Sequence, residues 1–69
     1  MSQIVLAVQG MTCQHCVAAV EKALRQVPGV QEVVVDLGAG RASVLGESLV
    51  PVVLVQVIEE EGYTAQPVQ

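Results

Sequence analysis

The sequence predicts an α+β fold in which the elements follow the order strand, helix, strand, strand, helix, strand. Three observations carry this prediction. Four short segments are rich in strand-forming apolar residues, two segments have helical spacing, and glycine or proline marks most of the boundaries between them. The 69 residues leave room for one domain, 1–69. We expect a four-stranded antiparallel sheet with two helices on one face.

The first strand is expected over residues 4–9 and ends at Gly10. Its side chains are apolar on nearly both faces, which is typical of a central strand. The residues predicted to face the core are Ile4, Leu6 and Val8.

Helical spacing follows over residues 14–27, and Pro28–Gly29 ends it. Thr12 is the expected N-cap, because its hydroxyl can accept a backbone N–H of the first turn. Glu21 and Arg25 lie four residues apart, where they can pair. The apolar stripe comprises Val17, Val20, Leu24 and Val27.

Two strands, residues 30–37 and 41–45, form a predicted hairpin through Gly38-Ala39-Gly40. Alternation places these side chains inward: Val33, Val35, Leu37, Ala42 and Val44. An apolar patch is expected on the open face of the sheet, from Val5, Ala7, Val34 and Leu45. Self-association through this patch is a hypothesis.

Residues 51–61 are ambiguous, because their valines favour a strand. Pro51 in a first turn, helical spacing through Leu54 and Ile58, and Gly62 as a C-cap favour a helix, which we predict. Residues 63–68 form the last strand. The resulting βαββαβ order is that of a ferredoxin-like sandwich.

Composition excludes several classes of protein. Hydrophobic residues make up 52% of the chain, too many for a disordered tail. No apolar run reaches about 18 residues, so no membrane insertion is expected. A net charge of −4 argues against nucleic acid as a partner. No secretory signal is visible, so a cytoplasmic location is expected by default.

Cys13 and Cys16 are the only cysteines, and they lie where a loop becomes a helix. At this spacing the two sulfurs can converge, and a helix N-terminus stabilises the thiolate that binds metal. Two thiolates without another fixed ligand suit Cu(I), a soft ion that accepts low coordination. Structural zinc prefers four ligands.

Different interpretations of the pair remain open. His15 lies between the cysteines and is expected to point away from the site as an exposed residue, with an inner ligand as the alternative. The cysteines could instead be small buried hydrophobes, or a redox pair of the thioredoxin type. That redox fold normally needs a longer chain. No Ser/His/Asp set can be assembled around the single histidine, His15, so no enzyme is expected.

The stretch Gly10-Met11-Thr12-Cys13-x-x-Cys16, with Val20-Glu21-Lys22-Ala23-Leu24 behind it and a tail from Leu54 to Tyr63, resembles the heavy-metal-associated domain family. The resemblance covers nearly the whole chain and is greatest to small bacterial copper chaperones. It implies the ferredoxin-like fold. Val50 departs from the family pattern, which usually has a polar cap there, and Val52, Val53 and Val55 stand where polar residues are common.

The resemblance also implies roles for single residues. Cys13 and Cys16 would be the Cu(I) ligands. Met11 would pack beneath the loop of residues 10–16 that carries them, called the metal loop below, and Tyr63 would lie close to that loop. Thr12 stands where relatives selective for zinc or cadmium often have an acidic residue, which favours copper over a different soft or thiophilic ion.

The implied function is that of a cytosolic Cu(I) metallochaperone. It would pass copper by ligand exchange to the metal-binding domain of a copper-transporting P-type ATPase, docking its acidic surface on a basic face. We expect a monomer, with a metal-bridged dimer as the alternative. Three further functions stay open: an N-terminal domain of such an ATPase, a mercury- or zinc-binding relative, and a thiol oxidoreductase. The initial Met and the end just after the last strand favour a separate protein.

Overall fold

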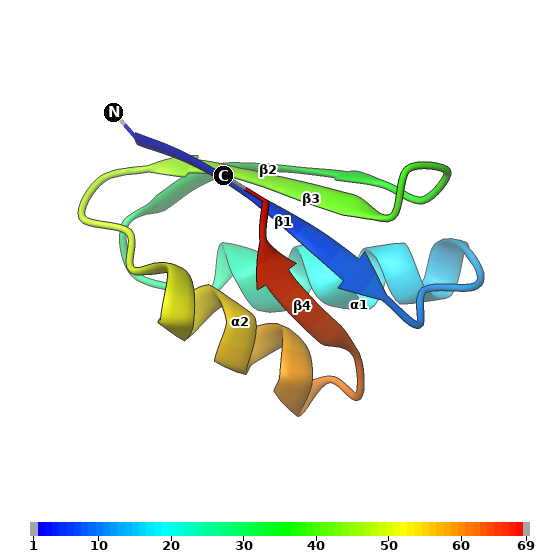
Figure 1. Cartoon of the computed structure of the whole chain (residues 1–69). Coiled ribbons are helices and arrows are strands. Elements are labelled where there is room, and N and C mark those ends of the chain that lie inside the picture. The colour runs from blue at the N-terminus through cyan, green and yellow to red at the C-terminus, as the bar shows by residue number, and fades with distance from the viewer. Residues whose placement is uncertain (1, 69) are drawn as a thin grey trace.

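The computed structural model describes residues 2–68 and confirms the predicted βαββαβ order. Figure 1 shows both helices on one face of the sheet, with the other face open. No helix within residues 2–68 is long and apolar enough to cross a membrane. The elements are β1 (Ser2–Gln9), α1 (Gln14–Arg25), β2 (Val30–Asp36), β3 (Arg41–Gly46), α2 (Pro51–Glu60) and β4 (Thr64–Pro67).

The sheet has the strand order β2-β3-β1-β4, and all three pairings are antiparallel. β1 is therefore a central strand, as its two apolar faces predict. Gln9 at the end of β1 pairs with Thr64 at the start of β4. This register brings the loop after β1 next to the segment before β4, at the same end of the molecule (Figure 1).

The core between the sheet and the helices is aliphatic. Burying one such side chain contributes roughly 1.5–3 kcal/mol. The predicted inward positions of β1, α1 and β3 are largely confirmed, although Ile4, Val17 and Val27 are only half-buried. The fully buried side chains of largest volume are Leu6, Leu24, Leu54, Ile58, Val20 and Val44.

Some predicted boundaries are wrong by one or two residues. α1 ends at Arg25 rather than at Val27, because the N–H groups of Gln26 and Val27 bond three residues back in a tight final turn. Leu37 lies in the turn after β2 and is half-buried. Tyr63 precedes β4 and does not belong to it.

The prediction that Thr12 caps α1 is wrong. The N-cap is Cys13, whose backbone is extended and whose side chain makes no capping hydrogen bond. The Cys13 carbonyl accepts the N–H of Cys16 at 3.1 Å and that of Val17 at 3.3 Å, so the first helical bonds start one residue later than predicted. Thr12 is exposed, one residue too early for its hydroxyl to serve as the cap.

The predicted α2 forms despite its valines, and its ends show why. Pro51 occupies the first turn, where a missing N–H costs nothing. At the other end Gly62 has a φ of 95°, its N–H bonds Glu59 O at 3.0 Å, and the N–H of Tyr63 bonds Ile58 O at 3.4 Å. This is a Schellman motif, and it fixes the backbone of Tyr63 relative to the helix.

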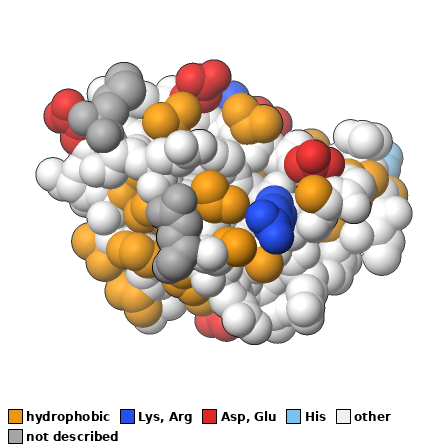
Figure 2. Space-filling view, turned by 45° about the horizontal axis from the view of Figure 1, so that its top comes forward, with side chains coloured by type: hydrophobic (Ala, Val, Ile, Leu, Met, Phe, Trp, Pro, Cys, Tyr) orange, Lys and Arg blue, Asp and Glu red, His pale blue; other side chains and the backbone are white. Residues whose placement is uncertain are grey.

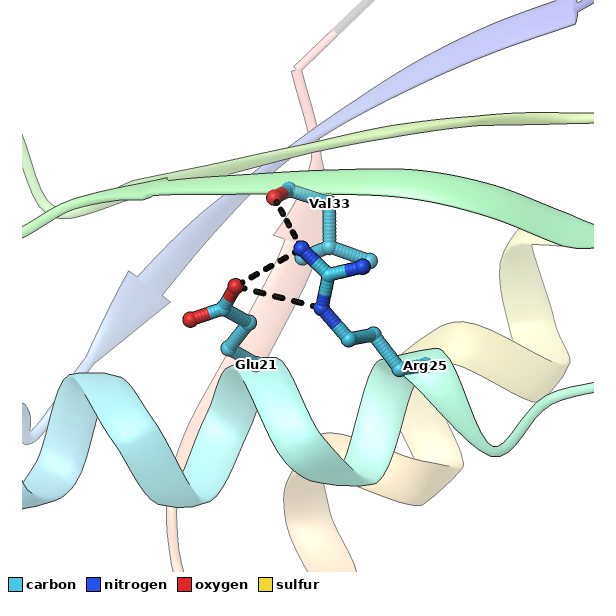
Figure 3. A network of polar contacts seen from close by, with 3 residues as sticks. All are labelled: Glu21, Arg25 and Val33. Atoms are coloured by element: carbon cyan, nitrogen blue, oxygen red, sulfur yellow. Dashed lines mark hydrogen bonds and ion pairs between the residues drawn. The ribbon is translucent and has the colours of Figure 1, made fainter.

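Glu21 and Arg25 form the predicted pair on α1 (Figure 3). Arg25 Nη2 and Nε donate to one Glu21 carboxylate oxygen at 2.9 and 3.1 Å. Nη2 also donates to the Val33 carbonyl at 3.5 Å, which ties α1 to the edge strand β2. An exposed pair of this kind contributes about 0.3–0.5 kcal/mol.

Among residues 2–68, large hydrophobic side chains are exposed near the start of α2, on the open sheet face and at Val68. Val50, Val52 and Val53 are exposed around the start of α2, and Figure 2 shows hydrophobic side chains gathered over this helix at the lower left. On the open sheet face Val34 is 56% exposed. Its predicted neighbours Val5, Ala7 and Leu45 are half-buried, so self-association through this face stays a prediction.

Candidate metal centre

The two cysteine sulfurs lie 3.7 Å apart at the start of α1. Cys13 is the N-cap and is exposed, whereas Cys16 lies in the first turn and is half-buried. The carbonyl of Cys13 accepts the N–H of Cys16, so the backbone turn that begins the helix also fixes the spacing of the two residues. The structure thus brings together the two predicted ligands.

Cys16 has a lowered pKa of about 6, against an ordinary value of 9.0. The largest cause is a hydrogen bond from the Tyr63 side chain. A backbone hydrogen bond from Thr12 follows, and bonds from Cys13 add smaller effects. Partial burial acts in the opposite direction but is outweighed. Cys16 is therefore a thiolate at neutral pH, which is the form that binds soft metal ions.

Tyr63 shows the matching effect. Its pKa is raised, first by the hydrogen bond to Cys16, then by burial, and then by the negative charges of Cys16, Cys13 and Glu61. A raised pKa keeps the phenol protonated, so it serves as a hydrogen-bond donor to the sulfur. The sequence predicts a thiolate from the position of Cys16 at a helix N-terminus. The structure adds a second cause, the Tyr63 phenol, which has the largest effect on the Cys16 pKa.

The geometry fits an ion held by two sulfurs. With metal–sulfur bonds of about 2.3 Å, a linear ion needs sulfurs about 4.6 Å apart and a tetrahedral ion about 3.8 Å. The observed distance of 3.7 Å between the two sulfurs is close to the tetrahedral value. However, no group of three or more His, Cys, Asp or Glu that could hold a metal occurs among residues 2–68. Rotation of the exposed Cys13 side chain can supply the linear spacing.

The remaining predicted site residues lie around this pair in different environments. Met11 is half-buried and packs against the core at the base of the loop. Thr12 and His15 are exposed. Tyr63 is half-buried and also packs against the core, at the side of the loop.

Gly10, which the sequence places at the end of a strand and at the start of the cysteine motif, also contacts Tyr63. A methyl group on its Cα would lie 3.2 Å from Cδ1 of Tyr63. Local sequence carries no signal for this contact, because it joins residues at opposite ends of the chain through the pairing of β1 with β4.

The sequence profile of the heavy-metal-associated domain matches residues 5–64. The chain is 45% identical over 65 residues to the copper chaperone CopZ of Staphylococcus aureus, covering 91% of this chain and 96% of CopZ. It is 46% identical over 61 residues to a copper-exporting P-type ATPase of Vibrio cholerae, covering 88% of this chain. It spans only 7% of that ATPase.

The chain also superposes closely on solved structures of similar sequence. A CopZ metallochaperone superposes with a TM-score of 0.90 at 37% identity, covering 94% of this chain and 100% of that one. Oxidized MerP from Ralstonia metallidurans gives 0.92 at 30% identity, covering 99% and 97%. The N-terminal domain of ZntA in its Zn(II) form gives 0.90 at 27% identity, covering 97% and 92%. One fold therefore serves relatives described with different metals.

Proposed function

The chain belongs to the heavy-metal-associated domain family, and from that premise we propose that it is a Cu(I) metallochaperone forming a single domain, 1–69. Cys13 and Cys16 would bind the ion as thiolates and pass it to the metal-binding domain of a copper-transporting P-type ATPase. The copper chaperone and copper ATPase among its relatives support copper as the cargo.

The observation that carries this proposal is the donor set. Two sulfurs lie 3.7 Å apart, and no third His, Cys, Asp or Glu within residues 2–68 completes a metal-binding group with them. A soft ion that accepts two thiolates suits such a site, whereas a structural zinc ion would lack half of its ligands. His15 is exposed and is expected to remain outside the inner coordination shell.

Low coordination also permits transfer. An incoming thiolate forms a third copper–sulfur bond, and the bond to the exposed Cys13 breaks first. A second incoming thiolate then replaces Cys16, which is anchored in the first turn of α1. Copper remains Cu(I) throughout, because each step exchanges one thiolate for another and transfers no electron.

The acidic surface favours a partner with a basic face. The net charge is −4, and Glu59, Glu60 and Glu61 are exposed at the end of α2, beside Tyr63. Complementary charge would accelerate the encounter and orient the two metal loops. We expect a cytoplasmic monomer without enzymatic activity, and a metal-bridged dimer would be the alternative when copper is bound.

A transfer assay tests the proposal. The copper-loaded chain is mixed anaerobically with the metal-binding domain of a copper-transporting ATPase, and the two are separated by ion exchange. Within the mixing time, copper should distribute over both proteins in proportions set by their affinities. Retention of all copper on this chain, or its loss to the buffer, would argue against a chaperone. Cys13→Ser is the matched variant, and it should not deliver copper.

The similarity to the ATPase favours a second candidate, a metal-binding domain of such a transporter. The site would be the same, but transfer would occur within one polypeptide. An antibody against this sequence distinguishes the two: a band near 7 kDa in native cells supports the chaperone. A single band of transporter size supports the domain.

Binding of zinc or mercury, and thiol oxidoreduction, are separate functions that the same cysteine pair could serve. Competitive titration of the reduced protein with Cu(I), Zn²⁺ and Hg²⁺ ranks the metals. A disulfide-reduction assay tests for redox activity, and we expect no turnover above that of free thiol.

A further inference from the structure

The ring of Tyr63 lies directly against Gly10. A methyl group on the Gly10 Cα would lie 3.2 Å from Cδ1 of Tyr63 and 4.0 Å from its Cα. Carbon atoms prefer separations of about 3.5–4.0 Å, so the ring would have to move to admit even one methyl group. Gly10 also has a φ of 101°, which a residue with a side chain adopts only with strain.

Tyr63 is held from its other side by α2. Its N–H bonds the Ile58 carbonyl at 3.4 Å in the Schellman motif, and Thr64 immediately after it pairs with Gln9. These backbone contacts leave the ring facing the loop. The bare Cα of Gly10 provides the surface on which the ring rests.

We propose that Gly10 is a positioning residue for Tyr63, because its missing side chain lets the ring lie against the loop that carries Cys13 and Cys16. Tyr63 is the only aromatic residue of the chain, so no other ring can take its place.

The competing explanation is that Gly10 only relieves backbone strain. Gly62 allows the two to be separated, because it has a similar φ of 95° but a methyl group there would meet nothing within 4 Å. Gly62→Ala therefore strains the backbone next to Tyr63 without touching the ring. Tyr63→Phe retains the ring and removes the hydroxyl.

The copper readout rests on the proposed function. Cu(I) retention against a chelator is measured for wild type, Gly10→Ala, Tyr63→Phe and the double variant. Each single variant should lose roughly 10-fold in affinity, as is typical when a residue behind a metal ligand is changed. The double variant should lose no more than Tyr63→Phe alone, and Gly62→Ala should stay near wild type. The proposal is overturned if the affinity losses of the two single variants multiply in the double variant. It is also overturned if Gly10→Ala keeps wild-type affinity, or if Gly62→Ala loses as much affinity as Gly10→Ala.

A metal-free readout separates this proposal from the proposed function. Near-ultraviolet circular dichroism of the reduced protein reports on Tyr63 alone, since no other aromatic residue is present. Gly10→Ala should weaken the tyrosine band, whereas Gly62→Ala should preserve it. A wild type that binds no Cu(I) would contradict the proposed function and leave this measurement to decide the role of Gly10.

Should Gly10→Ala fail to fold, a second variant decides. Replacing Tyr63 with Ala removes the obstructing ring, so Gly10→Ala in that background should cost no more stability than Gly62→Ala costs in wild type. If Tyr63→Ala folds but the double variant does not, strain rather than ring contact explains Gly10, and the proposal is overturned.

Discussion

The Cys13 sulfur lies 3.7 Å from the Cys16 sulfur, across the junction where the loop becomes α1. The Cys13 carbonyl accepts the N–H of Cys16, so the two residues are joined by the first turn of the helix itself. One sulfur is anchored in that turn and the other is exposed. This asymmetry allows one thiolate to hold a metal ion while the other exchanges.

The pKa of Cys16 provides the first prediction. At about 6 it is well below the ordinary value of 9.0, so the thiolate should persist as the pH falls from 9 to 7 and be protonated only near pH 6. NMR of protein labelled at the cysteine β-carbons would follow this titration. Because the folded pKa is lowered, the associated stability is fully present above pH 9 and is lost as the pH falls through 6.

Tyr63→Phe is the matched variant for this titration. It keeps the ring but removes the donor that has the largest effect, so the midpoint should move upward toward 9. A Cys16 midpoint unchanged by Tyr63→Phe would show that the backbone N–H groups alone lower the pKa.

Gly46 tests the packing of the end of β3 against the turn that precedes β2. A methyl group on Gly46 would collide with the carbonyl oxygen of Gly29, which already accepts the N–H of Glu47 at 3.0 Å. Gly46→Ala should therefore lower the free energy of unfolding by about 2–3 kcal/mol, measured by urea denaturation. Gly38→Ala is the control, since a methyl there would make only an ordinary contact at 3.5 Å. Equal effects of the two variants would refute the packing argument.

A substitution at Val50 is predicted to raise the free energy of unfolding. It is the N-cap of α2, is 50% exposed, and makes no side-chain capping bond. Val50→Asp should stabilise the protein by about 1 kcal/mol, because a carboxylate can accept first-turn N–H groups and complements the helix dipole. Thermal denaturation measures the change. Val50→Ala removes the exposed side chain without providing a cap, and an equal gain from it would show that capping is not the cause.

Most of the fold could be predicted from the sequence, because apolar periodicity and the glycine and proline positions are local signals. The central place of β1 and the β2–β3 hairpin were predicted, whereas the full strand order came from the structure. The ends of the helices were harder to predict: Val27 continues the apolar stripe of α1, yet the final turn tightens before it. Thr12 resembles an N-cap by residue type, but the extended backbone that defines the cap belongs to Cys13.

The site could be predicted only in part. The spacing of Cys13 and Cys16 is a local signal and identified the candidate ligands. The effect of Tyr63 on Cys16 and its contact with Gly10 depend on the pairing of β1 with β4, which joins distant parts of the chain. No local pattern in the sequence indicates that the Tyr63 ring contacts Gly10, so this contact could be found only in the structure.

In the proposed function, Cys13 and Cys16 hold one Cu(I) ion without another ligand from the chain. Anaerobic Cu(I) titration of the reduced protein, followed by native mass spectrometry, tests it most directly. Saturation at one copper per chain is expected, with no stoichiometric binding by the Cys13→Ser/Cys16→Ser variant. Stoichiometric copper retained by that double variant against a Cu(I) chelator would contradict it.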